Sequence, residues 1–386
     1  MHIISKYLYT SIKKISKKNF LPLHQPIFNK IEERFLTQCI RSSFVSSIGK
    51  NIFLFEKKLR EITKSKHAVA VINGTSALFL ACKAAKIDKD HEVLVPSMTF
   101  IGTVNAISYC NATPHFVDIE SENLGIDFKK LDCYLSEILK IKKNYSINKK
   151  TNKIVKFIIP VHLFGHPCKI IECINLAKKY KLTIIEDAAE GLGSYYKKKH
   201  LGTFGLAGVL SFNGNKIITT GGGGAIITNS KKMADNARHL STTAKIKNKL
   251  EFAHDLIGYN YRMPNLNASL GCAQIKKLKF FVKNKRKLFN KYYKIFKNSK
   301  YFQLFREKLH CESNYWLQTL ILKKKYSKYK NNIINDLNRK KIEVRPVWKL
   351  IHTLKPYKKM PKMNLANSQD LYKRIINIPS SANLYK

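Results

Sequence analysis

From residue 68 onward, short apolar segments alternate with stretches whose apolar residues recur at helical spacing. The segment AVAVIN, for example, is followed by ALFLACKAAK, in which apolar residues recur every three or four positions. Alternation of strands and helices is typical of a mostly parallel sheet that helices cover on both faces. Seven segments fit the strand pattern: 68–73, 92–96, 113–119, 154–165, 182–187, 207–212 and 225–229. The pattern therefore predicts an α/β fold with a mostly parallel, seven-stranded sheet.

Near residue 265 this alternation stops. A charged stretch with helical spacing covers about 268–300, and it is followed by the alternating segment 315–323, a helix near 327–340 and the apolar segment KIEVRPVW. Such a mixture is typical of a smaller α+β domain. We therefore expect three parts, a basic N-terminal arm at 1–20, a large domain at 21–264 and a small C-terminal domain at 265–386.

Two segments lack the apolar pattern of a core element. Residues 134–153 begin as a helix and continue as a Lys- and Asn-rich stretch, for which we expect a solvated loop. Residues 1–18 are basic, contain serine and lack acidic residues, a composition that transit peptides share. Because neither an apolar core nor a cleavage signature accompanies them, a plain basic arm is the favoured interpretation.

The chain is strongly basic, with 71 Lys and Arg residues against 25 Asp and Glu residues and a formal net charge of +46. Such a charge can indicate nucleic-acid binding through the phosphates. However, the excess is spread along the chain, Lys far outnumbers Arg, and Ile and Asn are also abundant. This distribution favours a compositional bias over a nucleic-acid partner, although the charge should still attract anionic ligands.

The sequence shows no pattern typical of a membrane-spanning helix or of a metal site. No apolar run approaches the roughly 20 residues that a membrane-spanning helix needs. The eight cysteines form no CxxC pair and show no zinc-ligand spacing. We therefore expect no membrane partner, no metal, reduced cysteines and a cytoplasmic location.

Residues that can carry chemistry follow three of the predicted strands, at the sheet edge where ligands bind in folds of this class. The first group is Gly74, Thr75 and Ser76, where a strand ends and a helix begins. Free N–H groups at a helix start, beside glycine and hydroxyl side chains, can hold a phosphate. An ordinary helix cap has the same composition, so this motif alone leaves both interpretations open.

The second group is the pair Glu186 and Asp187 at the end of the strand 182–187. A carboxylate at this edge can hold a cationic partner. If the partner is the ring nitrogen of pyridoxal 5′-phosphate (PLP), the carboxylate keeps the ring protonated and the ring becomes an electron sink. A carboxylate that caps the next helix is the alternative.

The third group is Lys216, which lies between the strand 207–212 and the four glycines 221–224. A lysine that follows a buried strand can form a Schiff base with an aldehyde cofactor. Although Lys216 could be one more surface lysine, four consecutive glycines are costly to order unless the local turn requires them.

Together the three groups follow the order found in fold-type I PLP enzymes, with Lys216 29 positions after Asp187. From about residue 21 to its end, the chain resembles the DegT-type nucleotide-sugar aminotransferases. The resemblance is carried by NGTSAL, PSMTFIGTVNAI, PVHLFGHP, EDAAEGLGS, SFNGNKIITTGGGGAI and GYNYRMPNLNASLG. It implies an enzyme that uses PLP to move an amino group from glutamate to C4 of a nucleotide-linked 4-keto-6-deoxy sugar.

The resemblance also implies roles for single residues. Lys216 matches the lysine that carries PLP and moves the proton, and Asp187 matches the partner of the ring nitrogen. Phe100 matches the aromatic residue that stacks on the ring. Glu190 stands where many members have Gln or His near the cofactor hydroxyl, so its role is carried over less directly.

The phosphate site and the assembly state follow from the same resemblance. Asn260 matches a residue that reaches the phosphate of the neighbouring subunit's cofactor, which implies a homodimer with shared active sites. The residues that match the phosphate contacts within one chain are Gly74, Thr75, Ser76 and Ser211.

Other matches are looser. The segments RPVWKLIHTL and IPSSA resemble the aminotransferases of legionaminic-acid biosynthesis, which implies a 2-acetamido sugar. Two positions depart from the pattern of many relatives, because Gly222 replaces an acid and Leu206 follows Gly205 where an Asp is common. His162 is expected to be a packed structural histidine. Candidates for binding the diphosphate, each of which could equally be a solvated charge, are Lys245, His254, Arg262 and Arg345.

Three alternative functions remain. A regulator built on this fold would normally lack the lysine, which is present here. The PLP-dependent sugar dehydratases of the family have His at the position of Lys216. A basic nucleic-acid-binding protein is the alternative from a different class.

Overall fold

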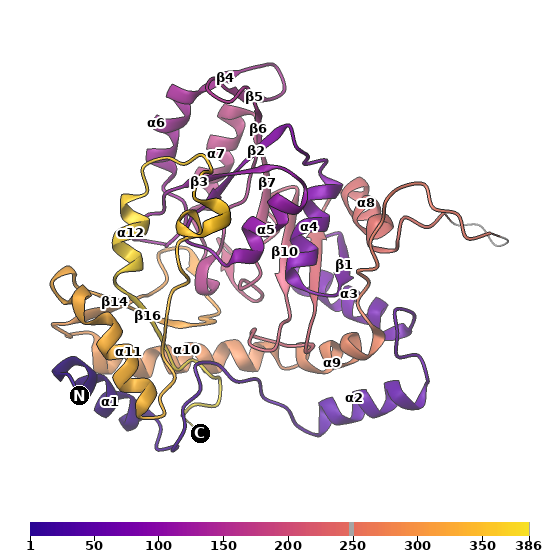
Figure 1. Ribbon diagram of the computed structural model, residues 1–386. Helices are drawn as coiled ribbons and strands as arrows, with labels where there is room; N and C mark the ends of the chain where they lie inside the picture. The colour runs from indigo at the N-terminus through magenta and orange to yellow at the C-terminus, as the bar shows by residue number, and fades with distance from the viewer. Residues whose placement is uncertain (247–250, 386) are drawn as a thin grey trace.

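The computed structural model describes residues 1–246 and 251–385. A central sheet has helices on both faces and is joined to a smaller sheet (Figure 1). Both chain termini lie near the smaller sheet. The twelve α-helices of the described residues are α1 (Ile3–Ile15), α2 (Lys30–Arg41), α3 (Lys50–Thr63), α4 (Gly74–Ala84), α5 (Ile101–Tyr109), α6 (Phe128–Ile138), α7 (Ile170–Tyr180), α8 (Lys231–Ser241), α9 (Asn265–Ile275), α10 (Leu278–Phe296), α11 (Lys330–Arg339) and α12 (Ala366–Tyr372).

The central sheet has the strand order β1-β11-β10-β7-β6-β2-β3. The five strands from β10 to β3 are parallel to their neighbours, whereas β11 is antiparallel to both β1 and β10. All seven strands predicted from the apolar pattern are present, which confirms the α/β prediction. Their bounds are β1 (His67–Val71), β2 (His91–Pro96), β3 (Thr113–Val117), β6 (Ile154–Ile158), β7 (Thr183–Asp187), β10 (Ala207–Ser211) and β11 (Gly224–Thr228).

Both faces of this sheet are buried, which explains why its strands are nearly continuous apolar runs. In β1, Val69 and Val71 pack into the core shared with α4 and α5, while Ala68 and Ala70 pack into the core shared with α3 and α9. Alternate residues of this one strand therefore pack into two separate cores, one on each face of the sheet.

The expected solvated loop within 134–153 is wrong in part. After α6, the chain forms the hairpin β4 (Leu139–Ile141) and β5 (Ser146–Asn148), and β5 pairs with β6 so that the central sheet has nine strands. The buried hydroxyl of Ser146 donates a hydrogen bond of 2.7 Å to the carbonyl of Tyr180. Polar side chains therefore fill this edge of the sheet, and an apolar pattern could not reveal it.

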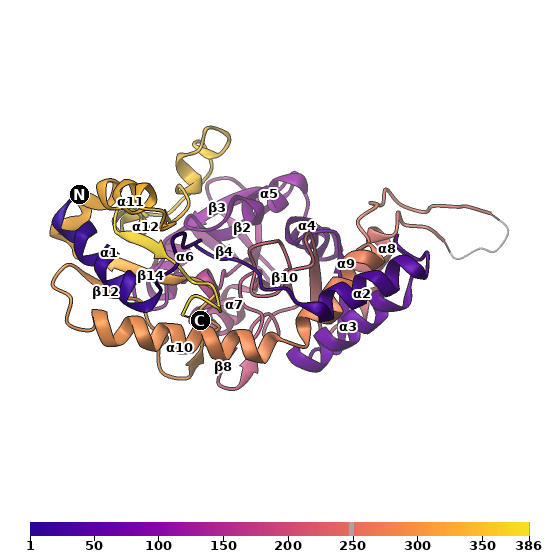
Figure 2. The ribbon, with the colours of Figure 1, turned by 90° about the horizontal axis from the view of Figure 1, so that it is seen from below.

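The smaller sheet has the order β12-β14-β16-β15 and is antiparallel throughout. Helix α10 runs from α9 beneath the central sheet towards this smaller sheet and α1 (Figure 2). The remaining strands form a third, three-stranded sheet near residue 200. The strands of the smaller sheet are β12 (Phe302–Leu304), β14 (Gln318–Leu322), β15 (Arg345–Pro346) and β16 (Ile375–Ile378). The strands of the third sheet are β8 (Tyr195–Tyr196), β9 (Lys199–His200) and β13 (Cys311–Glu312).

The segment expected to be a basic arm contains an ordered helix. Ile4, Leu8 and Ile12 lie on one side of α1, are fully buried, and pack with Leu288 of α10 and Leu337 of α11. The lysines of α1 lie outside this stripe, so the segment is an amphipathic helix docked on the smaller sheet. Among the described residues, no helix is long and apolar enough to cross a membrane.

Candidate active site

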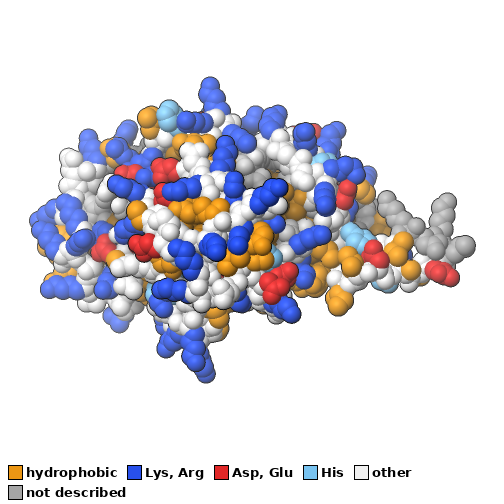
Figure 3. Space-filling view, turned by 90° about the horizontal axis from the view of Figure 1, so that it is seen from above, with side chains coloured by type: hydrophobic (Ala, Val, Ile, Leu, Met, Phe, Trp, Pro, Cys, Tyr) orange, Lys and Arg blue, Asp and Glu red, His pale blue; other side chains and the backbone are white. Residues whose placement is uncertain are grey.

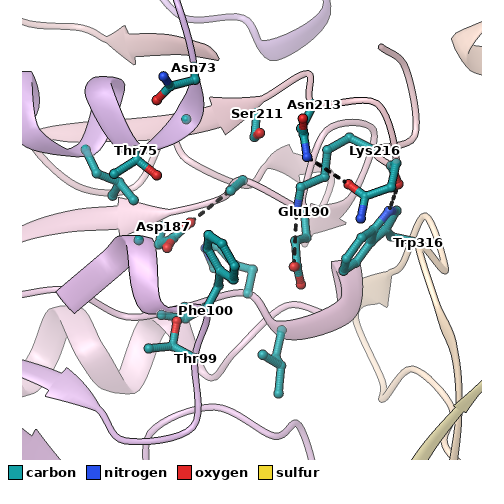
Figure 4. Close-up of a pocket in the computed structure, with 18 of the residues that line it drawn as sticks. Asn73, Thr75, Thr99, Phe100, Asp187, Glu190, Ser211, Asn213, Lys216 and Trp316 are labelled. Carbon is teal, nitrogen blue, oxygen red and sulfur yellow. Dashed lines mark hydrogen bonds and ion pairs between the residues drawn. The ribbon is translucent and has the colours of Figure 1, made fainter. Parts of the chain in front are cut away.

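A cavity of about 310 Å³ opens at the carboxyl ends of β7 and β10, next to the start of α4 (Figure 4). It brings together seven of the nine residues predicted for the site, which are Gly74, Thr75, Phe100, Asp187, Glu190, Ser211 and Lys216. Of the other two, Ser76 lies one residue beyond the lining, and Asn260 lies elsewhere. The cavity is therefore the candidate active site.

Lys216 projects from the turn that follows β10. Its backbone N–H donates to the carbonyl of Asn213 at 2.9 Å, which closes the turn. Its Nζ lies 3.1 Å from Oε1 of Glu190 and 4.0 Å from the ring centroid of Trp316. The side chain of Lys216 is only 13% exposed and lines the cavity, which distinguishes it from the many surface lysines.

Asp187 ends β7 and is buried beside the cavity. Its Oδ2 accepts a hydrogen bond of 2.6 Å from the hydroxyl of Thr103, and its Oδ1 accepts one of 3.1 Å from the backbone N–H of Ala189. The hydroxyl of Thr103 also lies 2.9 Å from that of Thr99. These contacts fix the carboxylate in an orientation from which it can meet a cationic ring nitrogen.

Glu186 points to the opposite side of the sheet from Asp187, because successive side chains in a strand alternate. It receives hydrogen bonds from the backbone N–H groups of Gly202, Phe204 and Gly205 and pairs with Nε2 of His162 at 3.0 Å. Burial by itself raises the pKa of Glu186, but the contacts with His162 and with the backbone outweigh it and hold this pKa below its usual value. Both side chains are buried, but His162 also lines the cavity, so its expected structural role stays a prediction.

The start of α4 forms one wall of the cavity. The side chain of Asn73 caps the helix by accepting a 2.7 Å hydrogen bond from the backbone N–H of Ser76. A Cβ on Gly74 would lie 2.9 Å from the Cβ of Ser211, so only glycine allows this close approach. The helix N-terminus and the hydroxyls of Thr75 and Ser211 therefore line one end of the cavity, a donor set that suits a phosphate.

Glu190 links Lys216 to the backbone of Phe164. Its Oε1 pairs with Lys216, and its Oε2 accepts a 2.7 Å hydrogen bond from the backbone N–H of Phe164. Burial raises the pKa of this carboxyl and Lys216 lowers it, and the net effect is a raised pKa. The neighbouring charge of Asp187 contributes to the increase.

Aromatic residues form the outer wall. Phe100 is half exposed, and its ring lies 6.0 Å from that of Trp348, which in turn stacks on Phe164 at 5.7 Å. The chain has only two tryptophans, and both Trp316 and Trp348 line the cavity. Sequence reasoning missed both, because each belongs to the C-terminal region and reaches the cavity only through the packing of the smaller sheet.

The proposed diphosphate ligands do not line the cavity. Lys245 and His254 bridge each other through their backbones on the segment that projects beyond α8 in Figure 1. Arg262 pairs with Val71, and its Nε is buried without a hydrogen-bond partner. Arg345 is exposed on β15. Their assignment to the substrate stays a prediction, as does that of Asn260, which is exposed and pairs with Thr242.

The residues present fit PLP. One end of the cavity offers phosphate donors, the strand end offers the carboxylate of Asp187, and the turn after β10 offers the amine of Lys216. A volume of about 310 Å³ is within the range of small-molecule sites. The donor set thus meets the three demands of a phosphorylated pyridine aldehyde.

Comparison with known proteins agrees with this geometry. A model described as the DegT/DnrJ/EryC1/StrS aminotransferase family matches residues 27–386. A GDP-perosamine synthase of Escherichia coli O157:H7 is 37% identical over 95% of this chain and 94% of its own. A UDP-4-amino-4,6-dideoxy-N-acetyl-β-L-altrosamine transaminase of Campylobacter jejuni is 31% identical over 89% of this chain and 88% of its own.

The fold also agrees with solved structures. Helicobacter pylori PseC, an aminotransferase involved in the biosynthesis of pseudoaminic acid, superposes with a TM-score of 0.85 at 26% identity and covers 95% of both chains. This similarity confirms the predicted fold-type I architecture.

Proposed function

Because the chain belongs to the DegT/DnrJ/EryC1/StrS aminotransferase family, we propose that it transfers an amino group from glutamate to C4 of a nucleotide-linked 4-keto-6-deoxy sugar. Aminotransferases of this family depend on PLP. The observation that carries the proposal is the convergence of Lys216, Asp187 and the start of α4 on one cavity. PLP supplies an aldehyde that accepts amines and a ring that stores electrons.

Lys216 has two tasks in this proposal. Its Nζ holds PLP covalently between reactions, and once it is released by the amino donor it takes a proton from the donor's Cα. A positioned proton transfer of this kind is worth about 10²–10⁴ in rate. Burial of the side chain and the contacts of Nζ with Glu190 and Trp316 keep the amine within the cavity.

Asp187 would pair with the ring nitrogen and would keep it protonated. The hydrogen bonds from Thr103 and Ala189 leave the carboxylate little freedom to turn away. Gly74, Thr75, Ser76 and Ser211 would bind the phosphate, and Phe100 would pack against the ring. Glu190 would contact the cofactor hydroxyl.

The class of reaction is better supported than the identity of the sugar substrate. The net charge of +46 favours a diphosphate-linked sugar and the dicarboxylate glutamate, and Lys and Arg side chains are scattered over the face shown in Figure 3. The segments that resemble the legionaminic-acid enzymes support a 2-acetamido sugar, and the similarity to a UDP-4-amino-4,6-dideoxy-N-acetyl-β-L-altrosamine transaminase supports a UDP-linked one. The similarity to a GDP-perosamine synthase supports a GDP-linked sugar instead.

Exposed apolar residues support a homodimer. Phe44, Ile48 and Phe53 near α2 and α3 are exposed, and Phe252 and Ile257 on the projecting segment are 84% and 87% exposed. Large apolar side chains that are this exposed are common at protein interfaces. A dimer also gives Asn260 a cofactor to reach, since it lies outside the cavity of its own chain. Sedimentation velocity that finds only monomer at micromolar concentration would reject this part of the proposal.

The cysteines support a reducing compartment. All eight are free, and seven of them are buried. This is the pattern of a protein that works where disulfides do not form. We propose the cytoplasm as the location.

The reaction is tested with glutamate and a panel of keto-sugars. UDP- and GDP-linked 4-keto-6-deoxyhexoses, with and without a 2-acetamido group, are supplied, and products are identified by mass spectrometry and NMR. The expected product carries an amine at C4 in place of the ketone. Lys216→Ala should abolish multiple turnovers, whereas Lys232→Ala, which removes an exposed lysine from α8, should not. Wild-type turnover by Lys216→Ala would overturn the proposal.

A further inference from the structure

The segment Asn314–Trp316 joins the small sheet to the two loops that carry the reactive residues. The amide of Asn314 donates to the carbonyl of Glu190 at 2.8 Å. The indole N–H of Trp316 donates to the carbonyl of Asn215, next to Lys216, at 2.7 Å. A segment that the sequence marks only as the start of a strand therefore touches both sides of the site.

Trp316 is held rigidly in this position. Its backbone N–H donates to Oδ1 of Asn314 at 2.8 Å, and its carbonyl accepts a hydrogen bond of 2.9 Å from Nζ of Lys285 on α10. Lys285 is fully buried and also donates to the carbonyl of Ser380. The backbone of Trp316 is thus held by two hydrogen bonds, and its ring is held by a third through the indole N–H.

The ring of Trp316 faces the charge of Lys216. Nζ of Lys216 lies 4.0 Å from the ring centroid, and Trp316 itself is only 3% exposed. An ammonium over an indole face is attracted by the electron density of the ring, and the attraction is stronger when water is excluded. Glu190 contacts the same nitrogen at 3.1 Å. Two groups of different chemistry therefore favour a positive charge at one atom.

We propose that Trp316 and Glu190 form a cation cage that holds the positive charge at Nζ of Lys216, with Trp316 as a positioning residue for the reaction. The inference rests on the proposed function, because the nitrogen in question is the one that bonds PLP. The cage acts on that nitrogen in two situations: when it is a free ammonium, and when it is bonded to the cofactor and carries a proton. In both, the cage keeps the charged nitrogen at one place in the cavity.

Other titratable groups near the nitrogen do not supply this effect. His24 lies close to Lys216 and contacts the carbonyl of Asn215, but burial lowers its pKa, and the charges of Lys285 and Lys216 lower it further, so it stays neutral. Lys285 repels a neighbouring cation to the extent that it is charged, and burial lowers its pKa too. The charge of Asp187 raises the pKa of Glu190, and the carboxylate of Asp187 is itself bonded to Thr103 and Ala189. Glu190 and Trp316 are the groups that contact the nitrogen directly and favour its positive charge.

The test is a pH titration of the holoenzyme, followed by the visible absorbance of bound PLP, which changes when the linking nitrogen loses its proton. Glu190→Gln keeps the acceptor for the N–H of Phe164 but removes the charge, and we expect the midpoint to fall by about one pH unit or more. Trp316→Leu should lower it by about 0.4–1.5 units, since a buried cation–π contact is worth up to about 2 kcal/mol. Trp316→Phe keeps an aromatic face, so its titration midpoint should lie between those of Trp316→Leu and the wild type.

Trp348→Leu is the matched control, because it removes the other indole from the same cavity wall without touching Lys216. Its midpoint should equal that of the wild type. A wild-type midpoint in Trp316→Leu, or equal shifts in Trp316→Phe and Trp316→Leu, would overturn the cage, because the role of Trp316 would then be packing or the indole N–H. If the wild-type protein takes up no PLP at all, the proposed function fails first, and the two failures are thereby distinguished.

Discussion

Glu186 and Asp187 are adjacent at the end of β7, yet their carboxylates lie on opposite sides of the sheet and in different chemical surroundings. Asp187 lines the cavity and is held by Thr103, whereas Glu186 is enclosed by three backbone N–H groups and His162. The alternation of the strand thus places one carboxylate of an acidic pair at the cavity and the other in a site of backbone hydrogen bonds.

Removing the charge of Asp187 should affect chemistry and leave folding intact. Asp187→Asn keeps one oxygen for the N–H of Ala189 and turns its NH2 group towards the hydroxyl of Thr103, which can accept from it, but it cannot keep the ring nitrogen of PLP protonated. We expect kcat/KM to fall by at least about 100-fold, equal to about 2.7 kcal/mol of activation free energy, with a nearly unchanged free energy of unfolding. Steady-state kinetics and urea unfolding measure the two quantities. An equal loss in both would assign Asp187 a structural role.

Removing the charge of Glu186 should have the reverse effect. Glu186→Gln removes the charge and replaces one of the two acceptor oxygens with an NH2 group, so at least one of the backbone N–H groups of Gly202, Phe204 and Gly205 loses its acceptor. The expected loss in the free energy of unfolding is about 1.5–3 kcal/mol, and the PLP absorbance of the remaining folded protein should match the wild type. A stable variant with altered PLP absorbance would contradict this division of roles.

A methyl group on Gly74 should weaken the binding of PLP. The new Cβ would lie 2.9 Å from the Cβ of Ser211, so the start of α4 must move away from the phosphate site. Gly74→Ala should lower PLP affinity at least about tenfold and cost about 1–3 kcal/mol of stability. Gly214→Ala is the control, because its Cβ would meet nothing within 4 Å. Equal PLP affinity in Gly74→Ala and the wild type would remove Gly74 from the phosphate site.

His166 should make the protein less stable in acid. Both ring nitrogens are buried beside Phe305 and Tyr315 and have no hydrogen-bond partner among the described residues, and burial lowers the pKa of His166 from 6.5 to about 3. Between these values the unfolded chain binds a proton that the folded chain does not, so the stability is complete above pH 6.5 and falls as the pH decreases towards 3. His166→Phe should flatten this part of a pH series of urea unfolding. An unchanged slope would show that other groups cause the acid sensitivity.

The sequence predicted the features that depend on local patterns, and it missed those that depend on contacts between residues far apart in the chain. The seven strands and the residues at their ends, such as Asp187 and Lys216, were predictable because strand periodicity and the sheet-edge rule are local. The docking of α1 was missed, since its apolar stripe of Ile4, Leu8 and Ile12 is interrupted by lysines and gains its partners only from residues near the other end of the chain. Trp316 was missed for the same reason, because its place over Lys216 depends on the packing of the small sheet.

The central claim is that Nζ of Lys216 bonds PLP, and one measurement tests it most directly. The holoenzyme is reduced with borohydride, digested and analysed by peptide mass spectrometry. We predict that the cofactor is found on the peptide that contains Lys216, with its phosphate retained, and that the protein loses its visible absorbance on reduction. Cofactor attached to any other of the chain's lysines, or to none, would contradict the account.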